Sequence, residues 1–66
     1  MFSDKEREVI AAMCRNDLSQ NRAAKDIYVA RGTVEYHIKK VREKTGLDCR
    51  HFMDAVRLLS MINKER

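Results

Sequence analysis

Residues 19–46 read SQNRAAKDIYVARGTVEYHIKKVREKTG and contain two helical patterns separated by a break of about three residues. The Ser19 hydroxyl can accept a hydrogen bond from the amides of the turn that follows it, so we predict a helix that starts near Gln20. Its apolar residues recur at helical spacing: Ala23, Ala24, Ile27 and Tyr28. The alanines allow a second helix to approach closely.

A second helical pattern begins near Arg31 and ends at Thr45, before Gly46. Glycine closes a helix readily because it adopts the left-handed conformation without strain. Three apolar residues share one side of this helix: Val34, Ile38 and Val41. Two helices joined by so short a break are the layout of a helix-turn-helix unit.

The outer side of this second helix is the candidate DNA-reading surface. At 100° per residue it presents Gly32, Tyr36, Lys39, Lys40 and Glu43 opposite the apolar side. Charged helix faces are often only solvated, which is the alternative interpretation. An exposed tyrosine within a basic face, directly after a tight turn between two helices, favours DNA.

The segment before Ser19 predicts a supporting helix that starts at about residue 4. Ser3 and Glu6 have the spacing of a capping box. Val9, Ile10 and Met13 form a narrow apolar stripe after it. Phe2 is either an anchor on the domain or a loose terminal residue.

Beyond Gly46 we predict a fourth helix over roughly residues 50–63, with Asp48 as its N-cap. Its predicted core stripe is Phe52, Ala55, Val56, Leu59 and Ile62. Three further apolar residues lie off that stripe: Met53, Leu58 and Met61. We interpret them as a dimer interface; alternatively, the domain wraps this helix more fully, or they are isolated surface residues.

The composition supports an all-α domain of four helices, a tri-helical core plus a C-terminal helix, that covers residues 1–66 as a single unit. The chain has 44% hydrophobic and 36% charged residues, no Pro and two Gly. The net charge is +4, and residues 22–44 hold seven basic and three acidic residues. This local excess is typical of a phosphate-binding surface, although acidic proteins or anionic membranes would also attract it.

We expect a cytoplasmic protein that does not enter a membrane, because no apolar run reaches the roughly 18 residues of a span and no signal peptide follows Met1. We expect no metal, cofactor or enzymatic activity. The candidate ligands Cys14, His37, Cys49 and His51 include no C-x-x-C or H-x₃-H pair. The chain also lacks a glycine-rich phosphate loop and a nucleophile elbow.

Residues 29–48, VARGTVEYHIKKVREKTGLD, resemble the C-terminal DNA-binding domain of PucR-type bacterial transcription regulators, which follow the pattern V-H-R-N-T-[LV]-x-Y-R-[LI]. The matching residues are Val29, Arg31, Thr33, Val34, Tyr36 and Ile38. The likeness covers about residues 16–60. Ala30, Gly32 and His37 depart from the pattern at positions that face DNA or cap the helix, so the family's base preference does not transfer.

The chain is also similar to LuxR-type domains, through Thr33-Val34-Glu35-x-His37-Ile38 and the opening Glu6–Val9. Members of both families are four-helix DNA binders that act in transcription as dimers, commonly fused to sensory domains. Met1 is followed almost at once by a helix cap, so we expect no sensory domain in this chain. Regulation would then depend on abundance, on homodimerisation through the C-terminal helix, or on a separate sensory or polymerase partner.

We therefore predict a sequence-specific double-stranded DNA-binding protein that acts in transcription. Ser19 and Gln20 would clamp a phosphate. Base edges would be approached by Arg31, Thr33, Glu35, Tyr36 and Lys39, beside Gly32, and the backbone would be held by Lys40, Arg42 and His37. The main rival is a protein-interaction module that docks on polymerase or another regulator through residues 50–63. RNA binding is a weaker option, because the chain has few stacking aromatics.

Overall fold

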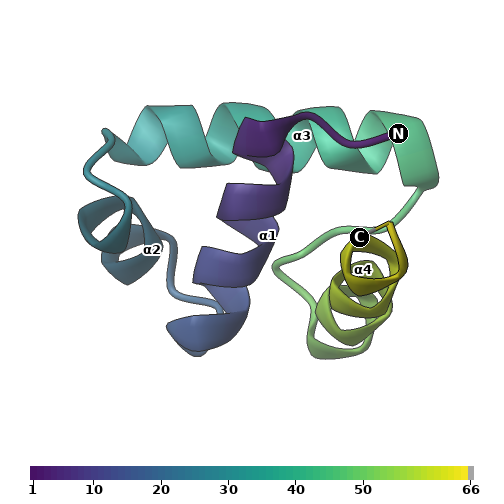
Figure 1. The fold of residues 1–66 in the computed structure, drawn as a ribbon. Helices are drawn as coiled ribbons and strands as arrows, with labels where there is room; N and C mark the ends of the chain where they lie inside the picture. Colours follow the sequence, from purple (N-terminus) through teal and green to yellow (C-terminus); the bar gives the residue numbers. More distant parts are fainter. Residues whose placement is uncertain (66) are drawn as a thin grey trace.

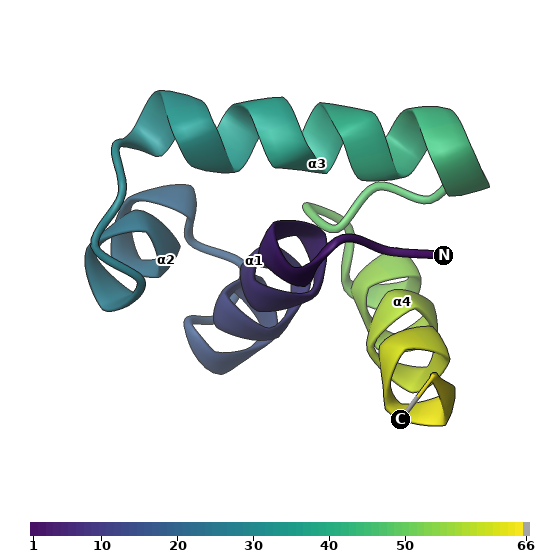
Figure 2. The same cartoon turned by 45° about the horizontal axis from the view of Figure 1, so that its top comes forward.

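A computed structural model describes residues 1–65 of the chain. Within them the chain forms four α-helices, which are α1 (Asp4–Arg15), α2 (Gln20–Asp26), α3 (Arg31–Thr45) and α4 (Phe52–Lys64). α3 runs along one edge of the molecule, and the other three helices lie on one side of it (Figures 1 and 2). The predicted all-α, four-helix architecture is confirmed.

α1 is the centre of the packing, although the sequence marked it only as a support. It contacts each of the other three helices, whereas α4 packs against α1 alone among the described helices. Val9, Ile10 and Met13 on α1 are fully buried. The capping box is present, with the Ser3 hydroxyl accepting from the Glu6 amide and the Glu6 carboxylate accepting from the Ser3 amide.

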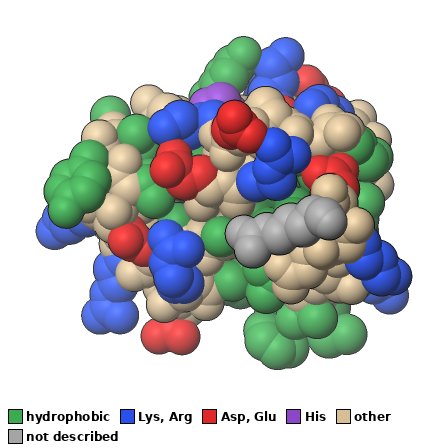
Figure 3. All heavy atoms as spheres, in the orientation of Figure 1, with side chains coloured by type: hydrophobic (Ala, Val, Ile, Leu, Met, Phe, Trp, Pro, Cys, Tyr) green, Lys and Arg blue, Asp and Glu red, His purple; other side chains and the backbone are tan. Residues whose placement is uncertain are grey.

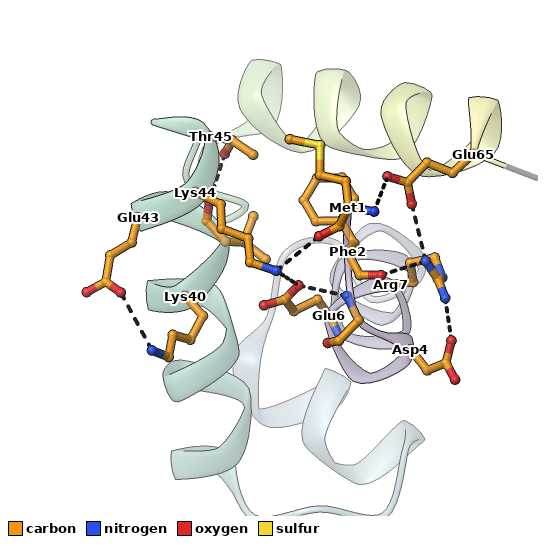
Figure 4. A network of polar contacts seen from close by, with 12 residues as sticks. Met1, Phe2, Asp4, Glu6, Arg7, Lys40, Glu43, Lys44, Thr45 and Glu65 are labelled. Atoms are coloured by element: carbon orange, nitrogen blue, oxygen red, sulfur yellow. Dashed lines mark hydrogen bonds and ion pairs between the residues drawn. The ribbon is translucent and has the colours of Figure 1, made fainter.

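The N-terminal segment ties α1 to both α3 and α4, as Figure 4 shows. Phe2 is 4% exposed, so it is the anchor rather than a loose end. Glu6 accepts a 2.7 Å hydrogen bond from the Lys44 ammonium at the end of α3, and Arg7 pairs with Glu65 beyond α4. Burial opposes ionisation of Glu6, but the bonds from Lys44 and from the Ser3 amide outweigh it and lower its pKa.

The helix-turn-helix unit is formed by α2 and α3, which pack through the buried Ala23 and Ala24 on α2 and Val34 on α3. Ser19 caps α2 by accepting a hydrogen bond from the Arg22 amide, as predicted. Tyr28 is not a core residue, however. It follows the end of α2, has a positive φ of 59° and is 95% exposed, because α2 stops at Asp26 and the chain must reverse there.

The predicted core stripe of α4 was correct for Ala55 and Ile62 but wrong for Phe52 and Val56. Ala55, Leu58 and Ile62 face the core, whereas Phe52 and Val56 are exposed. Apolar residues occupy most of the circumference of this helix, so its periodicity alone did not decide which side would pack on α1.

Asp48 does not cap α4. An N-cap at Asp48 would place the first helical residue at Cys49, whereas α4 begins at Phe52. The N-cap of α4 is His51. Asp48 instead accepts a hydrogen bond from the Arg50 amide, and its own amide donates to the Asp54 carboxylate. Asp48 therefore shapes the loop between α3 and α4.

Candidate nucleic-acid interface

α3 buries one side and leaves the other open. Val34, Ile38 and Val41 pack into the core, which sets the rotation of the helix. Most of the remaining side chains of α3 are exposed, among them Arg31, Lys39 and Arg42. In Figure 3 lysine and arginine side chains, interspersed with carboxylates, lie along the edge of the molecule that α3 occupies. The predicted reading face is thus free to meet a partner.

One flank of α3 borders a hollow of about 380 Å³ that we call the basic hollow. Its lining residues are Gln20, Arg31, Glu35, Tyr36, Ile38, Lys39, Arg42 and Arg50. The hollow therefore brings together residues from α2, α3 and the loop that follows α3. Six of the predicted DNA-contacting residues lie around it, and four of the side chains that line it are cationic.

Two cations of the basic hollow, Arg31 and Arg42, are only weakly neutralised by the protein itself. Arg31 Nε lies 3.1 Å from Glu35 Oε1, but both side chains are more than half exposed. Arg42 Nη1 lies 3.8 Å from Asp48 Oδ2. The exposed Arg31–Glu35 pair contributes little to stability, and the Arg42–Asp48 contact is long although its carboxylate is buried. A phosphate can thus compete for these guanidinium groups.

Arg50 was not predicted as part of the site. Its guanidinium makes a two-point pair with the Asp48 carboxylate, with Nη2 2.7 Å from Oδ2 and Nε 3.0 Å from Oδ1. Hydrogen bonding from Arg50 lowers the pKa of Asp48 to about 2. The signal in the sequence was the spacing Asp48-x-Arg50, which places an acceptor two residues before a donor in a turn.

Beyond Tyr36, which also lines the hollow, further predicted DNA-contacting residues lie around α3. Tyr36 is 56% exposed, and its ring meets the His37 ring edge-on with the centroids 5.1 Å apart. Lys40 Nζ lies 5.7 Å from the centroid of the Tyr36 ring. Gly32 is exposed and Thr33 half-buried near the start of the helix. Gly32, Thr33 and Lys40 extend this surface beyond the hollow.

Two buried polar atoms near this surface have no hydrogen-bond partner among the described residues. They are Gln20 Oε1 and His37 Nδ1. Ser19, in contrast, uses its hydroxyl as the cap of α2, so the side chain is already engaged within the fold. Of Ser19 and Gln20, the two residues predicted to bind a phosphate, Gln20 is therefore the better candidate for a contact outside the protein.

The predicted dimer residues do not form one surface. Leu58 is fully buried against α1, so its assignment to a dimer interface was wrong. Met61 is half-buried, and only Met53, which is 61% exposed, is open to a partner. The exposed apolar side chains of α4 are instead Phe52, Met53 and Val56, which we call the α4 apolar cluster. Figure 3 shows hydrophobic side chains gathered at the edge of the molecule where α4 lies.

A sequence model of the PucR C-terminal helix-turn-helix domain matches residues 7–63, which is most of the chain and includes all of α2 and α3. The chain belongs to this family. Comparison with curated proteins and with solved structures gave no match. The resemblance to PucR-type domains is confirmed, and the match extends beyond residues 16–60, into α1 and to the last turn of α4.

Membership in the PucR family indicates a DNA-binding domain of a transcription regulator, and such domains are typically not enzymes. The departure at Ala30 from the family pattern has a visible effect. Ala30 is the N-cap of α3, and its methyl group cannot accept a hydrogen bond from the first amides of the helix. The start of α3 therefore has no side-chain cap, and the Thr33 amide donates to the Ala30 carbonyl instead.

None of the described helices is long and apolar enough to cross a membrane. Within residues 1–65, no three side chains of the metal-binding types His, Cys, Asp and Glu cluster as an ion would require. Both cysteines are free thiols. Burial raises the pKa of the Cys49 thiol to about 12, so this side chain is a core residue with little thiolate character.

Proposed function

We propose that this PucR-family domain binds duplex DNA sequence-specifically and regulates transcription, with α3 inserted into the major groove. The observation that carries the proposal is the basic hollow along the exposed flank of α3. α3 has 15 residues and is about 22 Å long, and a helix with its side chains is close to the width of the major groove, about 12 Å. The hollow places four cations beside such a helix.

The exposed residues of α3 differ in the part of the DNA that each can contact. Arg31, at the first turn, can donate two hydrogen bonds to guanine, and Tyr36 and Thr33 can contact thymine methyl groups. Glu35 pairs with Arg31 in the free protein. Among the bases, its carboxylate accepts a hydrogen bond only from the amino group of cytosine, and it repels phosphate. Glu35 therefore disfavours binding to DNA sites that offer its carboxylate no donor. Lys39, Lys40 and Arg42 lie along the exposed side, where they meet phosphates or base edges.

We further propose that two copies bind half-sites roughly 34–36 Å apart. The support for dimerisation is the α4 apolar cluster, because apolar side chains that are exposed together on one helix, unlike isolated ones, are typical of interaction surfaces. The same cluster favours the rival function, docking on a polymerase subunit or another regulator. A Met53→Glu variant should weaken self-association in sedimentation equilibrium while leaving the helicity of the domain unchanged.

Fluorescence anisotropy across a salt series tests DNA binding. The duplexes are a random sequence and the DNA that flanks the gene of this protein. We expect a log–log slope of about −3 to −4 per bound copy, since each neutralised phosphate contributes about 0.9 and four cations line the hollow. Tighter binding to one duplex indicates sequence preference. Binding that is absent or insensitive to salt would favour the protein-docking function.

A substitution on the exposed face of α3 separates sequence-specific from non-specific DNA affinity. Tyr36→Ala should weaken binding to the preferred duplex more than binding to the random duplex, because a contact to a base edge is lost while the phosphate contacts remain. The Tyr36 ring is 56% exposed and lies beside His37 and Lys40 at the surface, so the fold should tolerate its loss. An unchanged ratio of the two affinities, with normal helicity, would remove Tyr36 from the reading surface. Ser60→Ala is the matched control, because it alters an exposed side chain of α4 that belongs neither to α3 nor to the α4 apolar cluster.

A further inference from the structure

Arg50 is the one residue around the basic hollow that belongs to neither helix of the helix-turn-helix unit. It lies in the loop between α3 and α4, eight residues after Arg42, yet the two arginines line the same hollow. The loop therefore returns a cation to the surface that α3 presents. A residue in this position lies beside α3 rather than on its outer face.

The position of the Arg50 guanidinium is fixed by Asp48. Nε and Nη2 both donate to the carboxylate, and the Arg50 amide donates to Asp48 Oδ1 at 2.9 Å. The Asp48 side chain is only 8% exposed, whereas that of Arg50 is 48% exposed. A guanidinium carries five N–H donors, so three of them remain on the side that faces away from Asp48.

The pairing with Asp48 does not cancel the positive charge of Arg42 and Arg50. Arg42 Nη1 also lies 3.8 Å from the same carboxylate, so two guanidinium groups share one negative charge that is itself buried. The exposed surface is left positive. A preoriented guanidinium with free, coplanar donors is well suited to a phosphate, which accepts two parallel hydrogen bonds.

We propose that Arg50 contacts a backbone phosphate of duplex DNA and that Asp48 is its positioning residue. The inference rests on the proposed function. It follows from the lateral position of Arg50, because the sugar–phosphate backbone borders the groove that α3 enters and so meets the residues at its sides. Phosphate contacts fix register and carry no sequence information, so Arg50 contributes equally to binding of every duplex.

A structural role is the competing explanation, because Arg50 and Asp48 also stabilise the loop. The salt dependence of binding separates the two. Loss of a phosphate contact reduces the log–log slope by about 0.9, whereas a loosened loop lowers affinity without changing the number of neutralised phosphates. The slope of log affinity against log salt concentration therefore distinguishes the two explanations, whereas a change in affinity alone does not.

The test compares Arg50→Gln with Arg57→Gln on wild-type background, by anisotropy with the preferred and random duplexes between 50 and 200 mM salt, a range over which counterion release is marked. Arg57 is an exposed arginine of α4 that does not line the hollow, so it controls for the loss of one positive charge. Arg50→Gln should bind both duplexes about tenfold more weakly, with a shallower slope. Arg57→Gln should match the wild type.

Several results would overturn the inference. An unchanged slope in Arg50→Gln assigns Arg50 to the loop alone, and equal reductions in Arg50→Gln and Arg57→Gln indicate a general loss of charge. If the wild type does not bind DNA, the proposed function itself fails. If Arg50→Gln does not fold, the wild-type domain can still be tested by NMR. Addition of duplex should shift the Nε–H resonance of Arg50. A resonance that does not move at saturation refutes the contact between Arg50 and a phosphate.

Discussion

Removal of the Asp48 charge should destabilise the domain in a pH-dependent manner. In Asp48→Asn the side-chain carbonyl can still accept from the Arg50 amide, so the turn is retained while the charge is lost. The pKa of Asp48 is lowered from 3.8 to about 2 by the hydrogen bonds and charge of Arg50. One pKa unit corresponds to about 1.36 kcal/mol, so the ionised carboxylate contributes roughly 2 kcal/mol to the free energy of unfolding. This is an upper value, because the half-exposed Arg50 is partly screened by solvent.

The sign of the pH dependence follows from the direction of the shift. A carboxylate whose pKa is lowered on folding stabilises the folded state above the unfolded pKa, and that stabilisation is lost as the pH falls through the folded pKa. The full difference between wild type and Asp48→Asn is therefore expected at pH 7. About half of it should remain at pH 3, and about a sixth at pH 2.

Urea denaturation followed by circular dichroism at pH 7, 4 and 3 measures this difference directly. Asp4→Asn is the control, since the Asp4 side chain is fully exposed although it pairs with Arg7, and its removal should have no measurable effect. A difference between wild type and Asp48→Asn that is the same at pH 7 and pH 3 would refute the argument. It would mean that Asp48 acts through shape or hydrogen bonding and not through its charge.

Further predictions concern packing and local backbone conformation. Leu58→Ala should lower the free energy of unfolding by about 2–5 kcal/mol in urea titrations, whereas Met53→Ala should change it by less than about 0.5 kcal/mol, because only Leu58 is buried. Tyr28→Gly should raise the melting temperature, since the left-handed backbone costs a non-glycine residue about 1 kcal/mol and the exposed ring contributes few contacts. Ala30→Ser should stabilise the domain by about 1 kcal/mol by capping α3, as measured by thermal unfolding. An unchanged melting temperature in Tyr28→Gly and Ala30→Ser would contradict these local assignments.

The helix boundaries were largely predictable from the sequence, because the signals that start and end helices are local. The capping box at Ser3, the N-cap at Ser19 and the left-handed Gly46 each act within a few residues of the chain. The buried side of α3 was also predictable, since its apolar residues Val34 and Ile38 occupy a narrow arc. Local rules sufficed wherever one arrangement was clearly favoured.

The features that the sequence did not predict depend on contacts between elements. α4 is apolar over most of its circumference, so its register was decided by the fit of Leu58 against α1 and not by its own periodicity. Arg50 reaches the basic hollow only because the loop folds back toward α2 and α3. Tyr28 continued the apolar spacing of α2, but the reversal of the chain removed it from the core.

DNA binding by the exposed face of α3 can be tested by an NMR titration of the ¹⁵N-labelled domain with duplex DNA. We predict that amide shifts concentrate at Gln20, along the exposed positions of α3 from Arg31 to Arg42, and at Arg50. Saturation of binding with the α3 resonances unmoved, or with changes confined to the α4 apolar cluster, would contradict DNA binding by this face.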